Sequence, residues 1–370
     1  MRKDQYTSLM SLHDHYMQRC LALALKGAGS VAPNPMVGAV LVCNDRIIGE
    51  GWHEIYGGPH AEVNCIQSVA ENDNKLIEQS TLYVSLEPCN HFGKTPPCTD
   101  LILKYDIPKV VIACRDPFIE VNGKGIERLR DAGVEVITGI LEKEAMDCNK
   151  RFFTFHTRQR PYIILKWAQT ADGWMGKKGG DRLLISNEFT NRLVHQWRGE
   201  EAAILVGTQT ALADNPALTN RLSPAANPLR IVIDRNLQLP ASLQVFDGSV
   251  KTIVFNTVKQ EESEHLIFYK LDEEKNLLPQ ILNVLYKMNI LSIMVEGGAQ
   301  TLQSFIDNNC WDEIRKIQSD SMAPELQNND LAVPAPIIPT AIHVSHEKLA
   351  TDKIDIYTNP SQIHQATLND

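Results

Sequence analysis

The segment EPCNHFGKTPPC, residues 87–98, follows a predicted strand, and the segment HAEV, residues 60–63, opens a predicted helix. The first segment supplies the thiols of Cys89 and Cys98, and the second supplies the imidazole of His60. One imidazole and two thiolates suit Zn²⁺ and leave a fourth coordination position for water, which is typical of a catalytic site. The pattern therefore predicts a catalytic Zn²⁺ site held by His60, Cys89 and Cys98.

A carboxylate stands beside these expected ligands. Glu62 follows His60 by two residues. Side chains at that spacing diverge within a helix, but they can converge in its first turn. Glu62 could there take a proton from water and hand it to a ring nitrogen and a leaving amine. The order H-x-E and then P-C is the pattern of zinc deaminases, so we expect Glu62 to be the catalytic residue.

Strands and helices alternate outward from this segment, which predicts a layered α/β domain. In the first half the expected strands are 37–43, 46–51, 81–86, 109–114 and 134–138, and the expected helices are 11–26, 61–70, 100–105, 125–132 and 141–150.

The alternation restarts after the basic, aromatic stretch RFFTFHTRQRP, so we place the domain boundary at about 145–160. We expect a deaminase domain at 8–150 and a second α/β domain at 158–345. No G-x-G-x-x-G follows a strand in the second half, so a Rossmann site is not supported. The segment 323–340 carries four prolines and is expected to be irregular. The expected strands are 162–168, 202–206, 230–234, 251–255 and 292–295, and the helices are 187–198, 279–288 and 299–308.

Length and composition agree with a globular, multidomain protein. The chain has 370 residues, of which 43% are hydrophobic and 22% charged, with a formal net charge of −9. An acidic chain carries no broad footprint for nucleic acid or anionic membranes. The first ten residues lack the apolar core of a secretory signal, so we expect a cytoplasmic protein. The six remaining cysteines are expected to be buried apolar side chains: Cys20, Cys43, Cys65, Cys114, Cys148 and Cys310.

Together with PNPMVG at 33–38 and GWH at 51–53, the two zinc segments resemble the deaminase domain of the bifunctional riboflavin-biosynthesis deaminase/reductases. The resemblance implies a cytidine-deaminase-like three-layer α/β/α domain that binds a phosphoribosyl-aminopyrimidine. It implies that Lys94 holds the phosphate, that Asn34 and His53 contact the pyrimidine, and that Asp116 and Asn122 lie near the substrate. Turn formation by Asn-Pro and Asp-Pro, and a solvated loop lysine at 94, are the alternatives.

The second half resembles the reductase domain of the same family, which is similar in fold to dihydrofolate reductase. The matching segments are LKWA at 165–168, ISN at 185–187, GTQT at 207–210, ADNPALTNR at 213–221, RIVID at 230–234 and EGG at 296–298. The resemblance implies that NADPH transfers a hydride to C1 of the ring-opened ribose, and that the protein forms homo-oligomers. It places NADP(H) on Ala168, Leu184, Thr210, Asp214, Arg235 and the turn Gly298, Ala299, Gln300, Thr301, Leu302, Gln303 and Ser304. It places the substrate on Lys166, Arg182, Arg198, Leu218, Arg221 and Glu296.

The chemistry of the backbone and of the arginine side chains is compatible with the cofactor and substrate roles that the resemblance implies. Backbone N–H groups at a helix start after Gly297-Gly298 can bind a pyrophosphate, and Arg198 and Arg221 could hold a phosphate in bidentate fashion. The structural alternatives are that Gly297-Gly298 only forms a turn, that the arginines only lie at the surface and that Glu296 only ends a strand. Lys166 could contact substrate or cap a strand.

Two alternative functions stay open. The family often has Ser and Trp where this chain has Arg182 and Leu184, so the second half could be a scaffold or a nucleotide-binding domain without chemistry. The second alternative function is that of a nucleic-acid base deaminase. The net charge and the missing basic-aromatic groove count against it. The expected reaction remains deamination of 2,5-diamino-6-(5-phosphoribosylamino)pyrimidin-4(3H)-one followed by reduction to 5-amino-6-(5-phosphoribitylamino)uracil.

Overall fold

The structure of the protein is a computed structural model that describes residues 12–92, 96–118, 121–179, 183–223, 225–326 and 329–362. The chain forms two compact units, Met1–Arg158 and Gln159–Asp370. Among the described helices, none has the length and apolar character needed to cross a membrane.

The first unit is built on a five-stranded sheet in the order β2-β1-β3-β4-β5. Strand β1 is antiparallel to both β2 and β3, whereas β3, β4 and β5 are parallel. Every residue of β1 is buried, which matches its uninterrupted apolar run. The strands are β1 (Gly38–Cys43), β2 (Arg46–Trp52), β3 (Thr81–Val84), β4 (Lys109–Ile112) and β5 (Glu135–Thr138).

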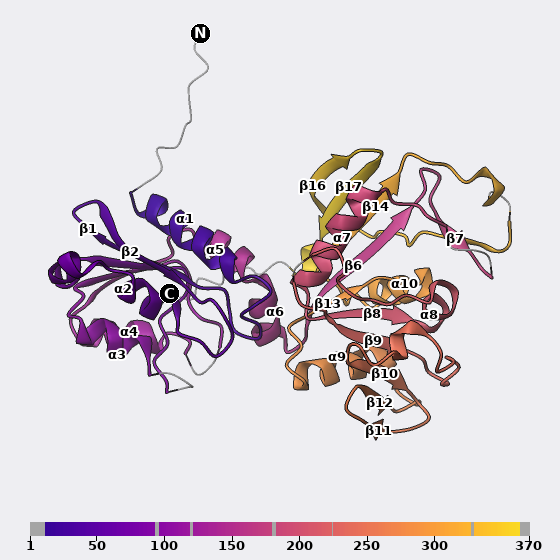
Figure 1. The fold of residues 1–370 in the computed structure, drawn as a ribbon, viewed down its shortest axis with the longest axis horizontal. Coiled ribbons are helices and arrows are strands. Elements are labelled where there is room, and N and C mark those ends of the chain that lie inside the picture. The colour runs from indigo at the N-terminus through magenta and orange to yellow at the C-terminus, as the bar shows by residue number, and fades with distance from the viewer. Residues whose placement is uncertain are drawn as a thin grey trace, which may run out of the picture. The chain divides into compact units, whose positions relative to one another are not determined.

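Helices cover both faces of this sheet, as Figure 1 shows, so the unit has three layers. Two glycines let helices rest directly on strand backbone. A Cβ on Gly38 would lie 2.0 Å from the Cys20 carbonyl oxygen, and one on Gly51 would lie 2.2 Å from the Cys65 nitrogen. The helices are α1 (Leu12–Ala24), α2 (Ala61–Gln67), α3 (Cys98–Lys104), α4 (Lys124–Asp131), α5 (Glu142–Cys148) and α6 (Lys150–Arg158), with 3-10 turns at Leu25–Gly27 and Glu71–Gln79.

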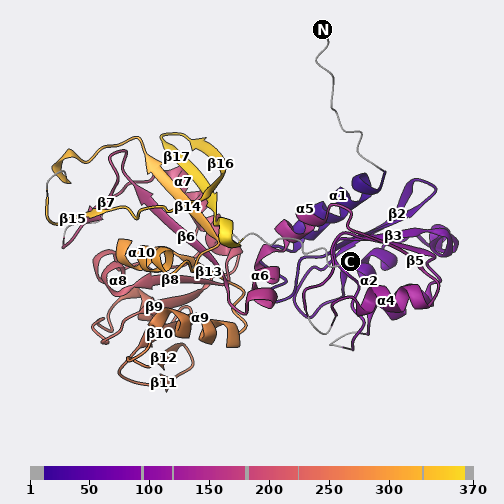
Figure 2. The same ribbon diagram turned by 180° about the vertical axis from the view of Figure 1, so that it is seen from behind.

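The second unit is built on a ten-stranded sheet in the order β11-β12-β10-β9-β8-β13-β6-β14-β17-β16, most of which can be followed in Figure 2. The seven strands from β12 to β14 in that order are parallel. They are β6 (Tyr162–Gln169), β8 (Ala203–Gly207), β9 (Leu229–Ile233), β10 (Thr252–Asn256), β12 (Leu266–Lys270), β13 (Ser292–Val295) and β14 (Glu313–Ser319).

The edges of the large sheet are antiparallel. Strand β11 (Glu261–Glu262) pairs with β12 at one edge, and the hairpin of β16 (Ile342–Leu349) and β17 (Asp352–Thr358) pairs with β14 at the other. A separate two-stranded sheet joins β7 (Trp174–Lys177) to β15 (Ala332–Pro334).

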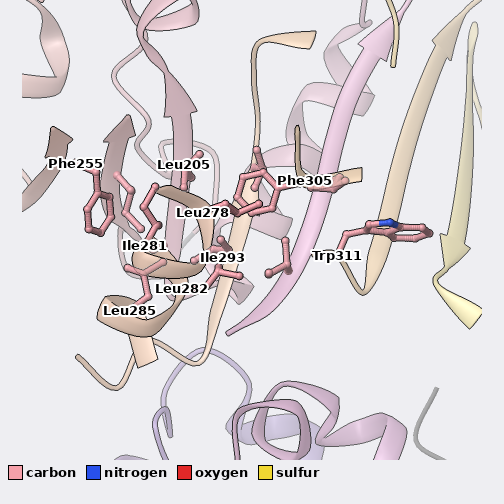
Figure 3. Packing of buried hydrophobic residues seen from close by; sticks show 14 of the residues in the cluster. Leu205, Phe255, Leu278, Ile281, Leu282, Leu285, Ile293, Phe305 and Trp311 are labelled. Carbon is pink, nitrogen blue, oxygen red and sulfur yellow. The ribbon is translucent and has the colours of Figure 1, made fainter. Parts of the chain in front are cut away.

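Two helices pack on each face of the large sheet. On one face, α9 (Leu277–Lys287) and α10 (Ala299–Asp307) enclose the main core, where Leu205, Phe255 and Phe305 meet side chains of α9 (Figure 3). On the other face lie α7 (Glu188–Glu200) and α8 (Thr208–Asp214). Short 3-10 turns occupy Gln244–Phe246, Pro324–Leu326 and Pro360–Gln362.

The strands and helices expected from the sequence are present, although several ends differ. The helix expected at 61–70 ends at Gln67. The stretch RFFTFHTRQRP, which lies at the expected domain boundary and was given no secondary structure, forms most of α6, in which Phe152, Phe153 and Phe155 are buried. Strands β7, β11, β12, β14, β15, β16 and β17 and helix α8 were not expected. Apart from β15 and one 3-10 turn, the described part of 323–340 is irregular, as its prolines predict.

Candidate functional site

Three elements of the first unit bring the expected zinc ligands together. His60 caps the start of α2, Cys98 is the first residue of α3, and Cys89 lies in the segment after β3. The Nδ1 atom of His60 lies 3.3 Å from the Cys98 sulfur and 3.5 Å from the Cys89 sulfur. All three ligand atoms lie within 4.8 Å of one another.

This donor set fits zinc. Tetrahedral bonds of about 2.0–2.3 Å place ligand atoms roughly 3–4 Å apart, as these atoms are. The Cys89 sulfur also accepts the backbone N–H of Cys98 at 3.3 Å. Hydrogen bonding from Cys98, helped by His60 and opposed by burial, lowers the pKa of the Cys89 thiol to about 4. Cys89 is therefore held in the thiolate form that binds metal.

Glu62 lies within the first turn of α2 and is 3% exposed. Burial raises the pKa of its carboxyl group, and the neighbouring His60 partly opposes that effect. Its carboxyl group is hydrogen-bonded with Cys98. The first turn therefore directs Glu62 to the ligand cluster, as the H-x-E spacing predicts.

Asn34 and His53 form a hydrogen-bonded pair next to this cluster. The His53 Nδ1 atom lies 2.9 Å from the Pro59 carbonyl oxygen, and its Nε2 atom lies 3.1 Å from the Asn34 side-chain nitrogen. Burial lowers the pKa of His53. A neutral ring that donates from Nδ1 and accepts at Nε2 satisfies both bonds. The His53 and His60 rings are 5.6 Å apart, so the pair borders the metal ligands.

Asp116 and Asn122 lie on the loop between β4 and α4. The Asp116 carboxylate is buried and accepts the backbone N–H of Phe118 at 2.8 Å. Asp116 therefore does form the local turn contact that was the alternative to a role in substrate binding. Burial raises the pKa of Asp116 to about 7. Asn122 is exposed, and its backbone N–H donates to the Phe118 carbonyl. The expected phosphate ligand Lys94 lies outside the described residues.

Glu87 organises this loop, and the sequence reasoning assigned it no role. Its buried carboxylate accepts backbone N–H groups from Asp116, Gly123, Gly125 and Ile126 at 2.9–3.3 Å. The only sequence signal was an acidic residue between a strand and Cys89, which does not reveal partners some thirty residues away.

The second unit contains a cavity of about 430 Å³ on the face covered by α7. It brings together most of the described residues that the sequence assigned to substrate, and three assigned to the cofactor. The substrate residues in its wall are Lys166, Arg198, Leu218, Arg221 and Glu296, and the cofactor residues are Leu184, Thr210 and Asp214. Arg182 lies outside the described residues.

A buried ion cluster forms one wall of the cavity. The Glu296 carboxylate, whose side chain is 5% exposed, receives Nε and Nη2 of Arg198 at 2.6 and 2.7 Å. The Lys166 ammonium lies 3.6 Å from the same carboxylate. Although burial opposes ionisation, Arg198 and Lys166 lower the pKa of Glu296 to about 2. Glu296 is therefore a fixed anion, and Lys166 points into the cavity instead of capping its strand.

His195 also lines the cavity, although the sequence reasoning missed it. Asn191, His195 and Arg198 share one face of α7 because they stand at i, i+4 and i+7. The His195 Nδ1 atom accepts the backbone N–H of Arg221 at 3.1 Å. Burial, followed by the cations of Arg198 and Arg221, lowers the pKa of His195. The i, i+4, i+7 spacing of Asn191, His195 and Arg198 in the expected helix 187–198 was the sequence signal that could have identified His195.

The remaining cofactor residues lie at the carboxyl ends of neighbouring parallel strands. Ala168 belongs to β6, and Arg235 follows β9 and pairs with Glu273 at 2.9 Å. A Cβ on Gly297 would lie 2.6 Å from Thr210, so the start of α10 meets α8 closely. Gly298 has a φ of 65°, a backbone conformation that favours glycine. The side chain of Leu302, which was expected to lie on the cofactor, is fully buried in the core. The carboxyl edge of a parallel sheet is where open α/β folds bind ligands.

Two protein families match the chain. Residues 10–114 match the family "Cytidine and deoxycytidylate deaminase zinc-binding region", and residues 161–319 match "RibD C-terminal domain". The riboflavin biosynthesis protein RibD of Aquifex aeolicus is 40% identical over 336 residues, which cover 88% of this chain and 90% of the relative. The RibD protein of Bacillus amyloliquefaciens is 38% identical over 312 residues, which cover 82% and 83%.

Solved structures agree along nearly the whole chain. The diaminohydroxyphosphoribosylaminopyrimidine deaminase/5-amino-6-(5-phosphoribosylamino)uracil reductase of Thermotoga maritima is 37% identical, with a TM-score of 0.83, and the match covers 94% of this chain and 98% of that one. RibD of Acinetobacter baumannii is 29% identical, with a TM-score of 0.84 and the same coverage.

Proposed function

The chain belongs to the RibD family of bifunctional riboflavin-biosynthesis proteins, and from that premise we propose which of its residues carry out each reaction. It is a deaminase and a reductase, with a cytidine-deaminase-like domain followed by a reductase domain of the expected α/β class. The expected family and fold class are thereby confirmed, and a C-terminal half without chemistry is not supported.

For the first reaction we propose hydrolytic deamination of 2,5-diamino-6-(5-phosphoribosylamino)pyrimidin-4(3H)-one. His60, Cys89 and Cys98 would hold Zn²⁺, which when bound makes water acidic enough to attack near neutral pH. As the C–O bond forms, Glu62 takes one proton from the attacking water and passes it to the ring nitrogen. Glu62 then transfers the proton of the added hydroxyl group to the exocyclic amine, the C–N bond breaks as the C=O bond forms, and ammonia leaves. The convergence of Glu62 on the ligand cluster is the observation that supports this proposal.

The other residues of this domain orient the pyrimidine. The His53 ring contacts the Pro59 carbonyl through one nitrogen and the Asn34 side chain through the other. His53 and Asn34 therefore have fixed orientations toward a pyrimidine ring bound beside the metal. Glu87 fixes the loop of Asp116. Burial is the main cause of the raised pKa of Asp116, and its carboxyl group lies close enough to Cys89 for that thiol to raise the pKa further. Lys94 stays a predicted phosphate ligand, and Asn122 a predicted substrate residue.

For the second reaction we propose reduction of the ribosyl group in the 430 Å³ cavity. NADPH would supply the hydride when bound, and C1 of the ring-opened ribose would receive it. Glu296, a fixed anion, accepts hydrogen bonds from substrate N–H or O–H groups. Arg198 binds Glu296 through Nε and Nη2, and its Nη1 donates to the Thr219 carbonyl. Because the guanidinium is engaged in this way, we assign Arg198 to holding that carboxylate and the exposed Arg221 to the phosphate. Lys166 stands where it can donate to a substrate oxygen, and Leu218 and the position of Arg182 complete the proposed substrate set.

The cofactor is proposed to lie along the carboxyl edge of the sheet. Thr210, Asp214 and Leu184 border the cavity, and Ala168, Arg235 and the segment from Gly298 to Ser304 extend the edge. In that segment backbone N–H groups, and not the buried Leu302 side chain, would meet a pyrophosphate. A homo-oligomeric assembly and a cytoplasmic location stay predictions.

One preparation can test both reactions. We expect purified protein to contain zinc by elemental analysis, to release ammonia from the diaminopyrimidine substrate, and to oxidise NADPH once the deaminated product is present. Single-stranded DNA should release no ammonia. Absence of ammonia from the phosphoribosyl-pyrimidine in zinc-loaded protein would refute the first assignment, and absence of NADPH oxidation with the deaminated product would refute the second.

A further inference from the structure

We propose that the β16–β17 hairpin carries a second metal site, formed by His343, His346 and Asp355, for a borderline divalent ion such as Zn²⁺ or Ni²⁺. One ligand atom from each of these residues lies within 4.8 Å of the other two. The hairpin lies at the edge of the large sheet, beside β14 (Figures 1 and 2). None of its residues belongs to the zinc cluster of the first unit or to the wall of the cavity.

A β-bulge brings the two histidines to one face. Residues at i and i+3 of a regular strand point to opposite faces, so His343 and His346 should diverge. In β16 the pairing with β17 shifts between His343 and Ser345, which makes Val344 an extra residue. The extra residue reverses the alternation, and both imidazoles come to the same side. Bulges of this kind re-aim side chains, and here the result is a pair of nitrogen ligands.

The partner strand places a carboxylate between them. Asp355 is paired directly with His346, and Tyr357 is paired with His343. The Oδ1 atom of Asp355 lies 2.8 Å from Nδ1 of His346 and 3.2 Å from Nε2 of His343. Side chains opposite and diagonal on neighbouring strands are within reach of one another. Two imidazole nitrogens therefore converge on one carboxylate oxygen.

The second carboxylate oxygen has a separate partner. Lys316 of β14 lies 2.9 Å from Oδ2 of Asp355. This ion pair orients the carboxylate and leaves Oδ1 toward the imidazoles. The Asp355 side chain is 14% exposed, whereas those of His343 and His346 are 48% and 51% exposed. The carboxylate is thus anchored on the sheet, and solvent can reach the nitrogen ligands and the ion between them.

The ligand types select the class of ion. Imidazole nitrogens suit Zn²⁺, Ni²⁺, Co²⁺ and Cu²⁺, whereas Mg²⁺ and Ca²⁺ favour oxygen ligands. Three protein ligands leave positions for water, and the Lys316 cation repels a second positive charge. We therefore expect weaker binding here than at the Cys89 and Cys98 thiolates. The bound ion would tie the edge strand β16 to β17.

The test is a metal titration of the full-length, tag-free protein with its thiolate site already loaded with zinc. Wild type should bind one further equivalent of Zn²⁺, and the double variant His343→Ala/His346→Ala should not. His265→Ala removes an exposed histidine of the same unit and should retain the further equivalent. Deaminase and reductase rates should be unchanged in all three proteins, which shows that the variants are folded.

Cobalt distinguishes the two sites by their spectra. Co²⁺ bound by Cys89 and Cys98 gives thiolate-to-metal charge-transfer absorption, whereas Co²⁺ on nitrogen and oxygen ligands gives only weaker visible bands. The second equivalent should add visible bands without charge transfer, and Asp355→Asn should weaken its binding at least tenfold. Equal stoichiometry in wild type and the double variant would overturn the proposal, as would a second equivalent with charge-transfer absorption.

Discussion

At the residue scale, three buried carboxylates differ in their partners and therefore in their chemistry. Glu62 borders a metal-ligand cluster, Glu87 receives four backbone N–H groups, and Glu296 is held by two cations. Burial raises the pKa of Glu62, whereas Arg198 and Lys166 outweigh the burial of Glu296, lower its pKa and keep it charged. We therefore expect Glu62 to exchange a proton and Glu296 to act only as an acceptor.

We expect Glu62→Gln to keep its zinc and to lose deamination by roughly 10²–10⁴-fold, because proton transfer by a positioned side chain is worth about that much. Ammonia release measures the loss, and elemental analysis measures the zinc. The matched control Glu54→Gln removes an exposed carboxylate nearby and should keep the full rate. A Glu62→Gln variant with wild-type deamination would show that the proton passes elsewhere.

Glu296→Gln should destabilise the protein at neutral pH by about 3–5 kcal/mol, because it leaves Arg198 and Lys166 without their buried anion. The pKa of Glu296 is lowered from 4.5 to about 2. Its contribution is therefore complete above pH 4.5 and is lost as the pH falls toward 2. Denaturant unfolding of both proteins should show their difference shrinking over that range.

The exposed Glu274→Gln is the control and should show no such pH dependence. A difference between wild type and Glu296→Gln that stays constant down to pH 2.5 would contradict the ion cluster.

At the scale of elements, α7 connects the cavity to the terminal hairpin. Its inner face carries Asn191, His195 and Arg198 toward the cavity. Its N-cap Asn187 accepts the Thr190 N–H at 3.0 Å and donates its side-chain N–H to the Leu349 carbonyl at 2.8 Å. The hairpin turn therefore fixes the start of the helix that contributes these residues to the cavity wall.

Asn187→Ala should lower the free energy of unfolding by about 1–2 kcal/mol, because it removes both the cap and the bond to the hairpin. Asn187→Ser keeps a capping oxygen and should recover much of the loss. Urea denaturation of the three proteins gives the comparison. Equal stability of Asn187→Ala and wild type would show that the helix start is held by other contacts.

At the scale of the whole molecule, each reaction has a unit with its own core. The zinc cluster lies within Met1–Arg158, and the cavity lies within Gln159–Asp370. Every described ligand or wall residue of a site comes from a single unit. We therefore expect each site to work with the side chains of its own unit.

Removal of the thiolate-bound zinc by a chelator should abolish ammonia release and leave NADPH oxidation unchanged when the deaminated product is supplied. Added zinc should restore deamination, and Cys89→Ala should reproduce the loss with a lower zinc content. Loss of both activities on chelation, with the fold intact by circular dichroism, would show that the two sites are coupled.

The sequence by itself determined the zinc ligands, the position of Glu62 beside them and the alternation of strands and helices. These signals are local, because they consist of spacing along a helix turn, order along the chain and apolar period. It did not reveal Glu87, His195 or the pairing of Arg198 with Glu296. Those roles depend on partners 26 to 98 residues away, which only the tertiary structure brings within hydrogen-bond distance. The two histidines of β16 show the same limit, since regular alternation separates them and a single extra residue in the strand pairing brings them together.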